Sequence, residues 1–312
     1  MQNYCNKLFT PLEAKSNIMG LSRPLIFAGL TFALLVILVI LGGVLGTFLS
    51  RHDKQTEGNN DNPLAPSSTS QLAAINWTDS AGIYYHAVFY QAGSNDLIFS
   101  LWDSQFQTWN GSRIQDLIPS NSSTDIQALN GTALTAVVCA YPWIDEPWNY
   151  EFGISLFYLD QENNIQELSS RDVRGSYWEI GNLSNSSTAY TTNGAAQIAA
   201  WWSLCTSDCD GSIWLFYQDT AARIQLANSS DWTATPYQMV SSGVASGTGL
   251  GVAAVENESQ GPTNGAAIYY ENNSNDLVEN YWDNYLWHQG QFLLQVSGTL
   301  PTVYHQLLTV TI

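Results

Sequence analysis

Four segments of the chain repeat one order of features, and this repeat limits the possible folds more than any other part of the sequence. In each segment an apolar and aromatic run ending in Tyr is followed by a short polar turn and a second apolar run. β-Branched and aromatic residues on both sides of such a turn are typical of a β-hairpin, because Asn, Asp and Gly tolerate the left-handed backbone of a tight turn. The repeat therefore predicts four hairpins, whose tyrosines are Tyr90, Tyr158, Tyr217 and Tyr270.

Each predicted hairpin has the same neighbours along the chain. A strand of small apolar residues precedes it, in residues 72–75, 134–138, 197–201 and 250–255, and a tryptophan follows it: Trp109, Trp178, Trp232 and Trp287. The intervals between the four tyrosines are 68, 59 and 53 residues. About four strands per unit and a period near 50 residues are typical of a β-propeller. We predict an all-β fold, a β-propeller of about four recognisable blades, with an irregular β-sandwich as the alternative.

A long apolar stretch precedes the repeats. Residues 24–49 contain no charged residue and exceed the roughly 20 residues that cross a bilayer as a helix, so a single transmembrane helix is predicted there. Residues 1–23 carry three basic residues against one Glu, which favours a cytosolic N-terminus. Residues 50–70 have few apolar side chains and are predicted to be a flexible stalk. Residues 71–312 are then the propeller domain.

Asn-x-Ser/Thr sequons are frequent after the apolar stretch, and none precedes it. They lie at Asn76, Asn110, Asn121, Asn130, Asn182, Asn185, Asn228, Asn257 and Asn272. Nine such sites in one domain predict N-glycosylation and a lumenal or extracellular location for it. The sequence therefore predicts a single-pass membrane glycoprotein, held in the membrane through residues 24–49.

The predicted domain is acidic. After residue 50 there are 26 Asp and Glu against six Lys and Arg, and the whole chain has a net charge of −18. A negative field repels phosphate backbones, which excludes nucleic acid as a partner and leaves neutral, hydroxyl-rich ligands open. Lys54 is the last lysine of the chain, so Schiff-base chemistry is excluded from the domain.

Cysteine and histidine are sparse in the predicted domain. Cys205 and Cys209 could close a small disulfide loop, which an oxidising compartment permits. Cys139 lies in a predicted inner strand, where we interpret it as a buried thiol. The histidines show no spacing suited to a metal ion or to activation of a nucleophile. The sequence predicts no metal site and no cofactor.

The repeat resembles the fungal fucose-specific lectins of the Aleuria aurantia type. The resemblance covers residues 71–290 and is clearest over residues 152–178, where an aromatic-Tyr hairpin, an Asn-Asn-Ile-Gln-Glu-Leu run and a downstream Trp follow one another. It implies a six-bladed propeller that binds sugars between neighbouring blades. Six blades need about 300 residues, whereas about 240 follow the apolar stretch. We therefore expect either a truncated six-bladed ring or a smaller ring that residues 306–312, as a partial fifth blade, close with the first.

The resemblance also implies which residues contact the sugar. In this family an Arg and a Glu bind the sugar hydroxyls, and a Trp or Tyr stacks on the sugar ring. The positions that match the Arg are Ala87, Ser155, Trp214 and Ala267, so the cation is missing throughout. The Glu is present as Glu167 and Glu279 and is replaced by Phe99 and Leu226 in the other two units. The candidate carbohydrate-binding residues are Glu167, Glu279, Trp109, Trp178, Trp232 and Trp287, with solvated strand residues and inter-blade packing as the alternative interpretations.

Three functions follow from these patterns. The first is a membrane-tethered, lectin-like protein that binds glycans or glycoproteins at blade interfaces, with fucose as one candidate sugar. The second is a propeller that lacks sugar binding and serves as a protein-interaction or structural ectodomain. The third, a glycosidase, depends on a partial match to a sialidase turn in residues 207–214 and on the adjacent carboxylates Asp145 and Glu146. We predict that the protein is not an enzyme, because Arg113, Arg171, Arg174 and Arg223 are too scattered to bind an acidic sugar.

Overall fold

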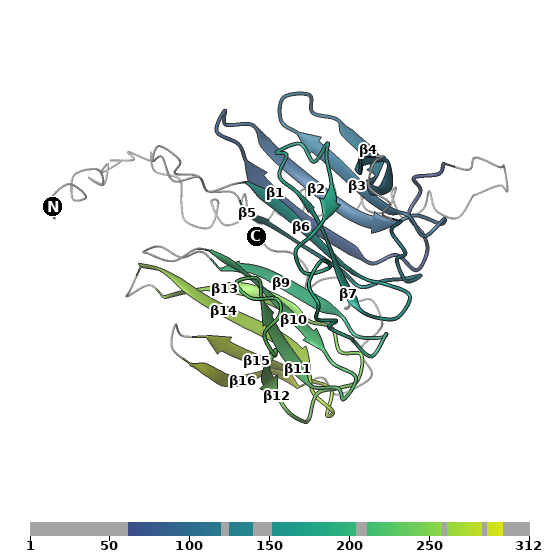
Figure 1. Cartoon of the computed structure of the whole chain (residues 1–312). Helices are drawn as coiled ribbons and strands as arrows, with labels where there is room; N and C mark the ends of the chain where they lie inside the picture. Colours follow the sequence, from purple (N-terminus) through teal and green to yellow (C-terminus); the bar gives the residue numbers. More distant parts are fainter. Residues whose placement is uncertain are drawn as a thin grey trace, which may run out of the picture. The chain divides into compact units, whose positions relative to one another are not determined.

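The computed structural model describes residues 62–119, 125–139, 152–203, 211–257, 261–282 and 286–295. All of them belong to one compact unit, Asp61–Ile312. They form four antiparallel sheets of four strands each, ordered β1-β2-β3-β4, β5-β6-β7-β8, β12-β11-β10-β9 and β13-β14-β15-β16 (Figure 1). Each sheet is a meander of consecutive strands, so we call the four sheets blades 1 to 4 in chain order.

The strands have the following bounds: β1 Leu72–Thr78, β2 Tyr84–Gln91, β3 Leu97–Asp103, β4 Trp109–Arg113, β5 Leu134–Cys139, β6 Gly153–Leu159, β7 Ile165–Ser170, β8 Glu179–Ile180, β9 Ile198–Ser203, β10 Ser212–Gln218, β11 Ile224–Asn228, β12 Tyr237–Val240, β13 Gly251–Asn257, β14 Gly261–Glu271, β15 Asp276–Trp282 and β16 Trp287–Gln295. A 3-10 helix, η2, spans Ile114–Leu117. The first strand of each blade is the inner one, and β5 lies beside both β1 and β9 while β9 lies beside β13. This arrangement confirms the predicted β-propeller architecture.

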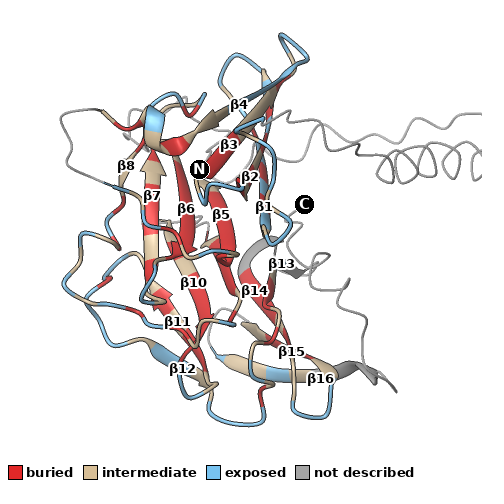
Figure 2. Ribbon diagram, turned by 90° about the vertical axis from the view of Figure 1, so that its right-hand side faces the viewer, coloured by how far each residue is buried: buried red, intermediate tan, exposed pale blue. Residues whose placement is uncertain are grey.

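Apolar side chains fill the interface between neighbouring blades, which we call a seam. Because side chains alternate along a strand, β6 points Ile154, Leu156 and Tyr158 into the seam with blade 1 and Phe157 and Leu159 into the seam with blade 3. Blades 2 and 3 are therefore buried on both faces, which explains the long red stretches of their strands in Figure 2.

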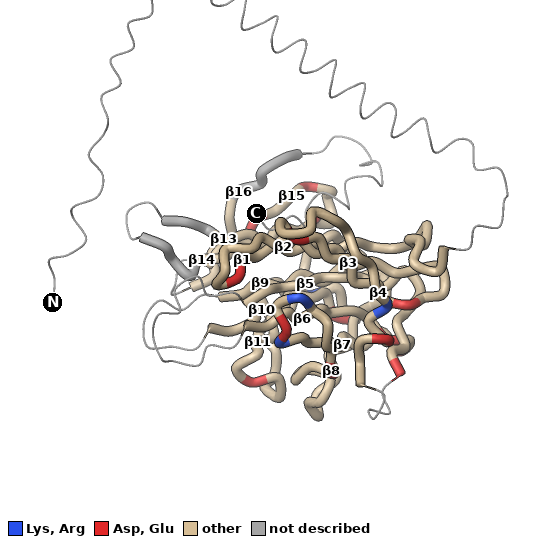
Figure 3. The backbone as a smooth tube through the Cα atoms, turned by 90° about the horizontal axis from the view of Figure 1, so that it is seen from above, with Lys and Arg blue, Asp and Glu red and all other residues tan. Residues whose placement is uncertain are grey.

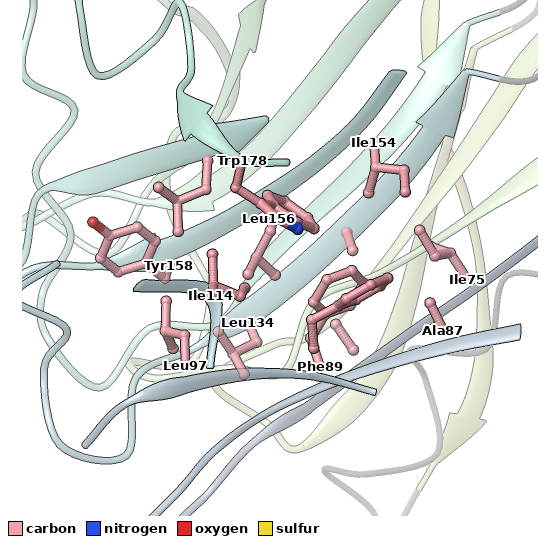
Figure 4. Packing of buried hydrophobic residues seen from close by; sticks show 14 of the residues in the cluster. Ile75, Ala87, Phe89, Leu97, Ile114, Leu134, Ile154, Leu156, Tyr158 and Trp178 are labelled. Carbon is pink, nitrogen blue, oxygen red and sulfur yellow. The ribbon is translucent and has the colours of Figure 1, made fainter. Parts of the chain in front are cut away.

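The seam between blades 1 and 2 shows the packing most clearly (Figure 4). Trp178 is fully buried there, and its ring meets those of Phe89 and Phe99 edge-on, with centroids 5.9 and 5.5 Å away. Its indole N–H donates to the carbonyl oxygen of Gly175 at 2.9 Å. Trp178 thus has both its apolar surface and its polar atom satisfied by the protein.

The four predicted hairpins are confirmed, and their turns share one backbone geometry. The residue two positions before the first apolar residue of the second run (Leu97, Ile165, Ile224 or Leu277) has a positive φ in every case, at Asn95 (69°), Asn163 (64°), Ala222 (58°) and Asn275 (61°). Asn adopts this left-handed conformation readily because its side chain bonds locally, whereas Ala does so at a cost of about 1 to 2 kcal/mol. The third hairpin therefore carries backbone strain that the others avoid.

The face of blade 1 that points away from blade 2 has the pattern of a seam face but is only partly covered. Leu72 pairs with Tyr90 as Leu134 pairs with Tyr158 and Ile198 with Tyr217. Leu134 and Ile198 are 4% and 2% exposed, whereas Leu72 is 46% exposed. On the same face Ile98, which pairs with Tyr90, is buried, and the carbonyl oxygen of Leu64 accepts a hydrogen bond from the Tyr90 hydroxyl.

The localisation predicted from the sequence requires correction. A single-pass protein needs an apolar helix of about 20 residues, and no helix in the described ranges is long and apolar enough to cross a membrane. The single-pass orientation is therefore withdrawn. Residues 1–23 and 24–49 lie outside the described residues, as do residues 50–61 of the predicted stalk and residues 306–312. Of the predicted stalk, residues 62–70 are described, and the Ser67 N–H donates to Gln91 in blade 1 at 2.8 Å.

The contrast between equivalent tryptophans gives a first prediction. Trp178→Ala should lower the free energy of unfolding by about 3 to 5 kcal/mol, because it leaves a cavity in a filled seam. Trp109→Ala should cost no more than about 0.5 kcal/mol, since Trp109 is 53% exposed. Urea unfolding followed by circular dichroism measures both. Equal losses would show that the outer face of blade 1 is covered in solution.

The strained hairpin gives a second prediction. Ala222→Gly should raise the free energy of unfolding by about 1 kcal/mol, because glycine adopts a positive φ without strain. Asn163→Gly, at the equivalent position of blade 2, is the control and should change stability by only a few tenths of a kcal/mol in comparison. Thermal unfolding of the two variants measures the difference, and a destabilised Ala222→Gly variant would contradict the strain.

Candidate functional site

Glu167 lies in β7 on the face of blade 2 that points toward blade 3. It is 4% exposed, and its carboxylate accepts hydrogen bonds from the Ser155 hydroxyl and the Leu183 N–H, both at 2.8 Å. A Cβ on Gly181 would come within 2.3 Å of the Glu167 side chain, so that side chain lies directly against the backbone of the next strand. Burial raises the pKa of Glu167, and the two hydrogen bonds oppose this shift only in part. The Glu167 carboxyl group is thus fixed in position by hydrogen bonds from the protein itself.

Glu279 occupies the equivalent position of β15 in blade 4 and is only partly buried. Its carboxylate accepts a hydrogen bond from the Tyr269 hydroxyl at 2.8 Å. Burial and this hydrogen bond together raise the pKa of Tyr269 to about 12. Glu279 lies on the face of blade 4 that points away from blade 3, so the structure does not bring Glu167 and Glu279 together.

The positions that match the family's arginine have been filled by other side chains. Ala87 and Ala267 are buried, and Ser155 donates to Glu167. Trp214 lies at the seam between blades 3 and 4, where its ring contacts Trp201, Trp282 and Trp287 with centroids 5.4 to 5.9 Å apart. Apolar packing and neutral hydrogen bonds have replaced the cation at these positions.

The four candidate tryptophans occupy three different environments. Trp178 is buried between blades 1 and 2, and Trp232, 6% exposed, is buried between blades 2 and 3 against Phe157. Trp109 lies on the exposed face of blade 1. Trp287 is partly buried between blades 3 and 4, and it lines a pocket. Inter-blade packing, the alternative interpretation, thus describes Trp178 and Trp232.

A pocket of about 500 Å³ opens at the seam between blades 3 and 4. Blade 3 contributes Tyr237, Met239 and Val240 from its outer strand β12, and blade 4 contributes Tyr270, Val278 and Asn280 from the face opposite. The remaining lining residues are Ser241, Ser242, Gly243, Asn272, Trp287, His288 and Gln289. The pocket thus has an aromatic wall and several neutral hydrogen-bonding groups, and its lining contains no Lys, Arg, Asp or Glu.

Sequence reasoning found Trp287 but missed the other residues of this pocket. Tyr237 and Asn280 belong to no recognised motif, and only an alignment of the four repeats could have drawn attention to Asn280. In the register of the sheets Asn280 pairs with Ile268 as Leu168 pairs with Leu156 and Ala227 with Leu215. Asn280 is therefore a polar residue at a position that is apolar in blades 2 and 3.

The four arginines of the domain are all engaged with carboxylates. The pairs are Arg113–Asp96, Arg171–Glu179, Arg174–Asp103 and Arg223–Asp219. The tightest joins Arg223 to Asp219 at 2.6 Å. Burial opposes ionisation of Asp219, but its hydrogen bonds, foremost those from Arg223, leave its pKa below the usual value. Figure 3 shows how few basic residues the blades carry.

The sequons remain predicted glycosylation sites. Asn76, Asn110, Asn130, Asn182 and Asn185 are exposed, and Asn228 and Asn272 are partly buried. Asn272 accepts hydrogen bonds from the N–H groups of Ser274 and Asp276 and so shapes its hairpin turn. Asn121 lies outside the described residues, and the side chain of Asn257 is not among those described.

The structure describes only some of the residues on which the cysteine and metal predictions depend. Cys205 and Cys209 lie outside the described residues. Cys139 is a free, partly buried thiol whose pKa burial raises to about 11. Within the described ranges no group of three His, Cys, Asp or Glu could hold a metal ion.

Known structures share this arrangement of blades. The lectin of Aleuria aurantia in complex with alpha-methyl-L-fucoside superposes with a TM-score of 0.55 at 20% identity, over 75% of this chain and 67% of the lectin. The chain has the fold of the Aleuria aurantia lectin. A second structure of the same lectin, described as a six-bladed β-propeller with a novel fucose recognition mode, gives 0.53 at 21% identity over 74% and 65%. AofleA from Arthrobotrys oligospora gives 0.55 at 18% identity over 74% and 58%.

The lectin-like fold is thus shared at low sequence identity. This chain spans 58 to 67% of the length of these three lectins. No protein-family model matches the chain, and no curated protein matches it in sequence. The likeness to the Aleuria aurantia lectins that the hairpin motif predicted is confirmed in the fold.

The buried carboxyl group of Glu167 gives a prediction about pH. Its raised pKa favours the neutral form in the folded state, so its contribution to stability is full below its ordinary value of 4.5 and is lost as the pH rises through the raised pKa. Glu167→Gln should therefore lack this loss and should be more stable than the wild type at pH 8. Urea unfolding between pH 4 and pH 8 measures this, with Glu279→Gln as the control. A difference between Glu167→Gln and wild type that does not grow with pH would contradict it.

Proposed function

We propose that this propeller binds glycans in the seam between blades 3 and 4. The observation that carries the proposal is the pocket of about 500 Å³ in which Trp287 and Tyr237 stand beside neutral hydrogen-bonding groups. An aromatic ring covers the apolar face of a sugar, while amide and hydroxyl groups bond to its hydroxyls. The lectin-like fold supports the same function, since the similar structures are lectins and one of them holds alpha-methyl-L-fucoside.

A binding function fits the carboxylates better than a catalytic one. Most glycosidases place two carboxyl groups on either side of the scissile bond, about 5 to 10 Å apart. Glu167 is held by Ser155 and Leu183 inside one seam, and Glu279 lies on the far face of blade 4. Asp145 and Glu146 lie outside the described residues. The seam pocket itself is lined by no carboxylate, which supports a role without acid-base chemistry.

Fucose is the first sugar to test, although the contacts would differ from those of the family. The arginine positions are filled by Ala87, Ser155, Trp214 and Ala267, so a charge-assisted hydrogen bond from Arg to a sugar hydroxyl is not available there. Charge-assisted bonds are roughly twice as strong as neutral ones. We therefore propose weak binding that depends on stacking against the aromatic residues of the pocket and on neutral hydrogen bonds.

The proposal predicts the effect of removing an exposed aromatic residue from the pocket. Tyr237→Ala should weaken glycan binding by the purified full chain about tenfold, because about 1.4 kcal/mol of stacking is lost. Tyr84→Ala is the matched control, since Tyr84 and Tyr237 are 59% and 58% exposed and only Tyr237 lines the pocket. A glycan array followed by calorimetry with the bound glycans measures the effect. No binding of any glycan at millimolar concentration would overturn the proposal.

A propeller that has lost sugar binding is the second candidate function. Two observations favour it. None of the four positions that match the family's arginine holds an Arg, and the carboxyl group of Glu167 is enclosed by protein hydrogen bonds. The exposed face of blade 1, with Leu72, Tyr84 and Trp109, would then offer an interaction surface. A blank glycan array, together with a protein partner that is lost in a Tyr84→Ser and Trp109→Ser variant, would favour this function over glycan binding.

A further inference from the structure

Asn280 is a buried polar residue, and one of the two polar atoms of its side chain has no hydrogen-bond partner in the protein. It is 7% exposed, and its Oδ1 has no hydrogen-bond partner. Its amide group faces the Tyr270 hydroxyl, and this hydrogen bond opposes the rise that burial causes in the pKa of Tyr270. The Asn280 side chain thus has a partner in Tyr270, while its Oδ1 atom has none.

The repeat itself shows that the fold does not need a polar residue at this position. Leu168 in blade 2 and Ala227 in blade 3 hold the same register position, and both are buried apolar residues at 0% and 4% exposure. Each packs in the seam with the preceding blade. A buried acceptor without a partner destabilises a protein, so Asn280 departs from the apolar packing that blades 2 and 3 have at this position.

The position of Asn280 provides a use for the unpaired atom. Asn280 lines the seam pocket together with Val278 from its own strand, and Trp287 of β16 lines it as well. A molecule in this pocket would meet an apolar ring and a hydrogen-bond acceptor. Pyranose sugars present an apolar face and a rim of hydroxyl donors, and this combination matches the two features.

The charge of the pocket restricts the ligand further. Its lining contains no Lys or Arg, and each arginine of the domain already pairs with a carboxylate. A sugar carboxylate would lose water on entry and would gain no cation in return. The net charge of −18 on the chain adds a long-range repulsion.

We propose that Asn280 is the residue that selects the ligand, and that its Oδ1 accepts a hydrogen bond from a hydroxyl or acetamido N–H of an uncharged sugar lying against Trp287. This inference depends on the proposed glycan-binding function and names the class of sugar that the seam pocket takes. Asn280 also distinguishes this seam from the other two: where Leu168 and Ala227 place an apolar side chain, Asn280 places an unpaired acceptor beside a pocket.

The test compares uncharged and acidic sugars on the purified full chain. The uncharged probes are alpha-methyl-L-fucoside, methyl β-galactoside and N-acetylglucosamine, and galacturonic acid is the charged counterpart of galactose. Saturation-transfer NMR and calorimetry should detect at least one uncharged probe and should find galacturonic acid at least tenfold weaker than the galactoside. Equal binding of the charged and uncharged pair would overturn the selection against charge.

Substitution of Asn280 separates a ligand-binding role from a structural one. Asn280→Leu restores the residue found at the equivalent position of blade 2, and it should weaken binding of the uncharged probes at least tenfold, about 1.4 kcal/mol. The double variant Asn280→Leu and Tyr270→Phe also removes the Tyr270 hydroxyl, which forms a hydrogen bond with the Asn280 side chain. It should melt at or above the temperature of the wild type, because it removes an unpaired buried acceptor and leaves no new one.

The outcomes distinguish the inference from the function on which it depends. If the wild type binds no glycan on an array and none of the probes, the proposed function itself fails. If the wild type binds a probe and Asn280→Leu binds it equally well, only the role of Asn280 is wrong. A double variant that melts well below the wild type would show that the protein itself satisfies Oδ1, and would also overturn the inference.

Discussion

The packing of one sheet face against the next is the interaction on which the rest of this structure depends. A four-stranded sheet has two faces, and blades 2 and 3 bury both by inserting Leu156 and Phe157, or Leu215 and Phe216, into opposite seams. Apolar burial contributes roughly 25 cal/mol per Å² of surface removed from water, so no blade is stable by itself and each depends on its neighbours. The outer face of blade 1 is an exception to this constraint, because Leu72 and Trp109 are exposed whereas their equivalents in blade 2, Leu134 and Trp178, are buried.

The candidate sites differ from seam to seam. The repeat places equivalent positions in each seam, but different residues occupy those positions. Phe99 occupies in blade 1 the position that Glu167 occupies in blade 2 and Leu226 in blade 3. Trp178 and Trp232 are buried in their seams, where each indole is part of the core. Between blades 3 and 4 the described residues combine the partly buried Trp287 with neutral polar groups around a pocket.

Stability and recognition are opposed at Asn280. The chain places an acceptor where two of its own blades place Leu168 and Ala227, and it thereby gives up apolar packing in that seam. Such a departure is informative because neighbouring repeats provide the reference state within one molecule. Glu167 is the contrasting case: its carboxyl group has protein donors for both oxygens, so the fold itself offsets part of the cost of its burial.

The sequence by itself determined the four hairpins and the order of strands around them, because alternation of apolar residues and the chemistry of the turns are local properties. It also placed Trp178, Trp232 and Trp287 in seams without saying which of them a ligand could reach. Only the tertiary structure decided that Glu167 is enclosed, that Glu279 lies on the opposite face and that Tyr237 meets Asn280 across a pocket. These facts depend on how two blades approach each other, and the space left between them is set by side chains more than 30 residues apart in the chain.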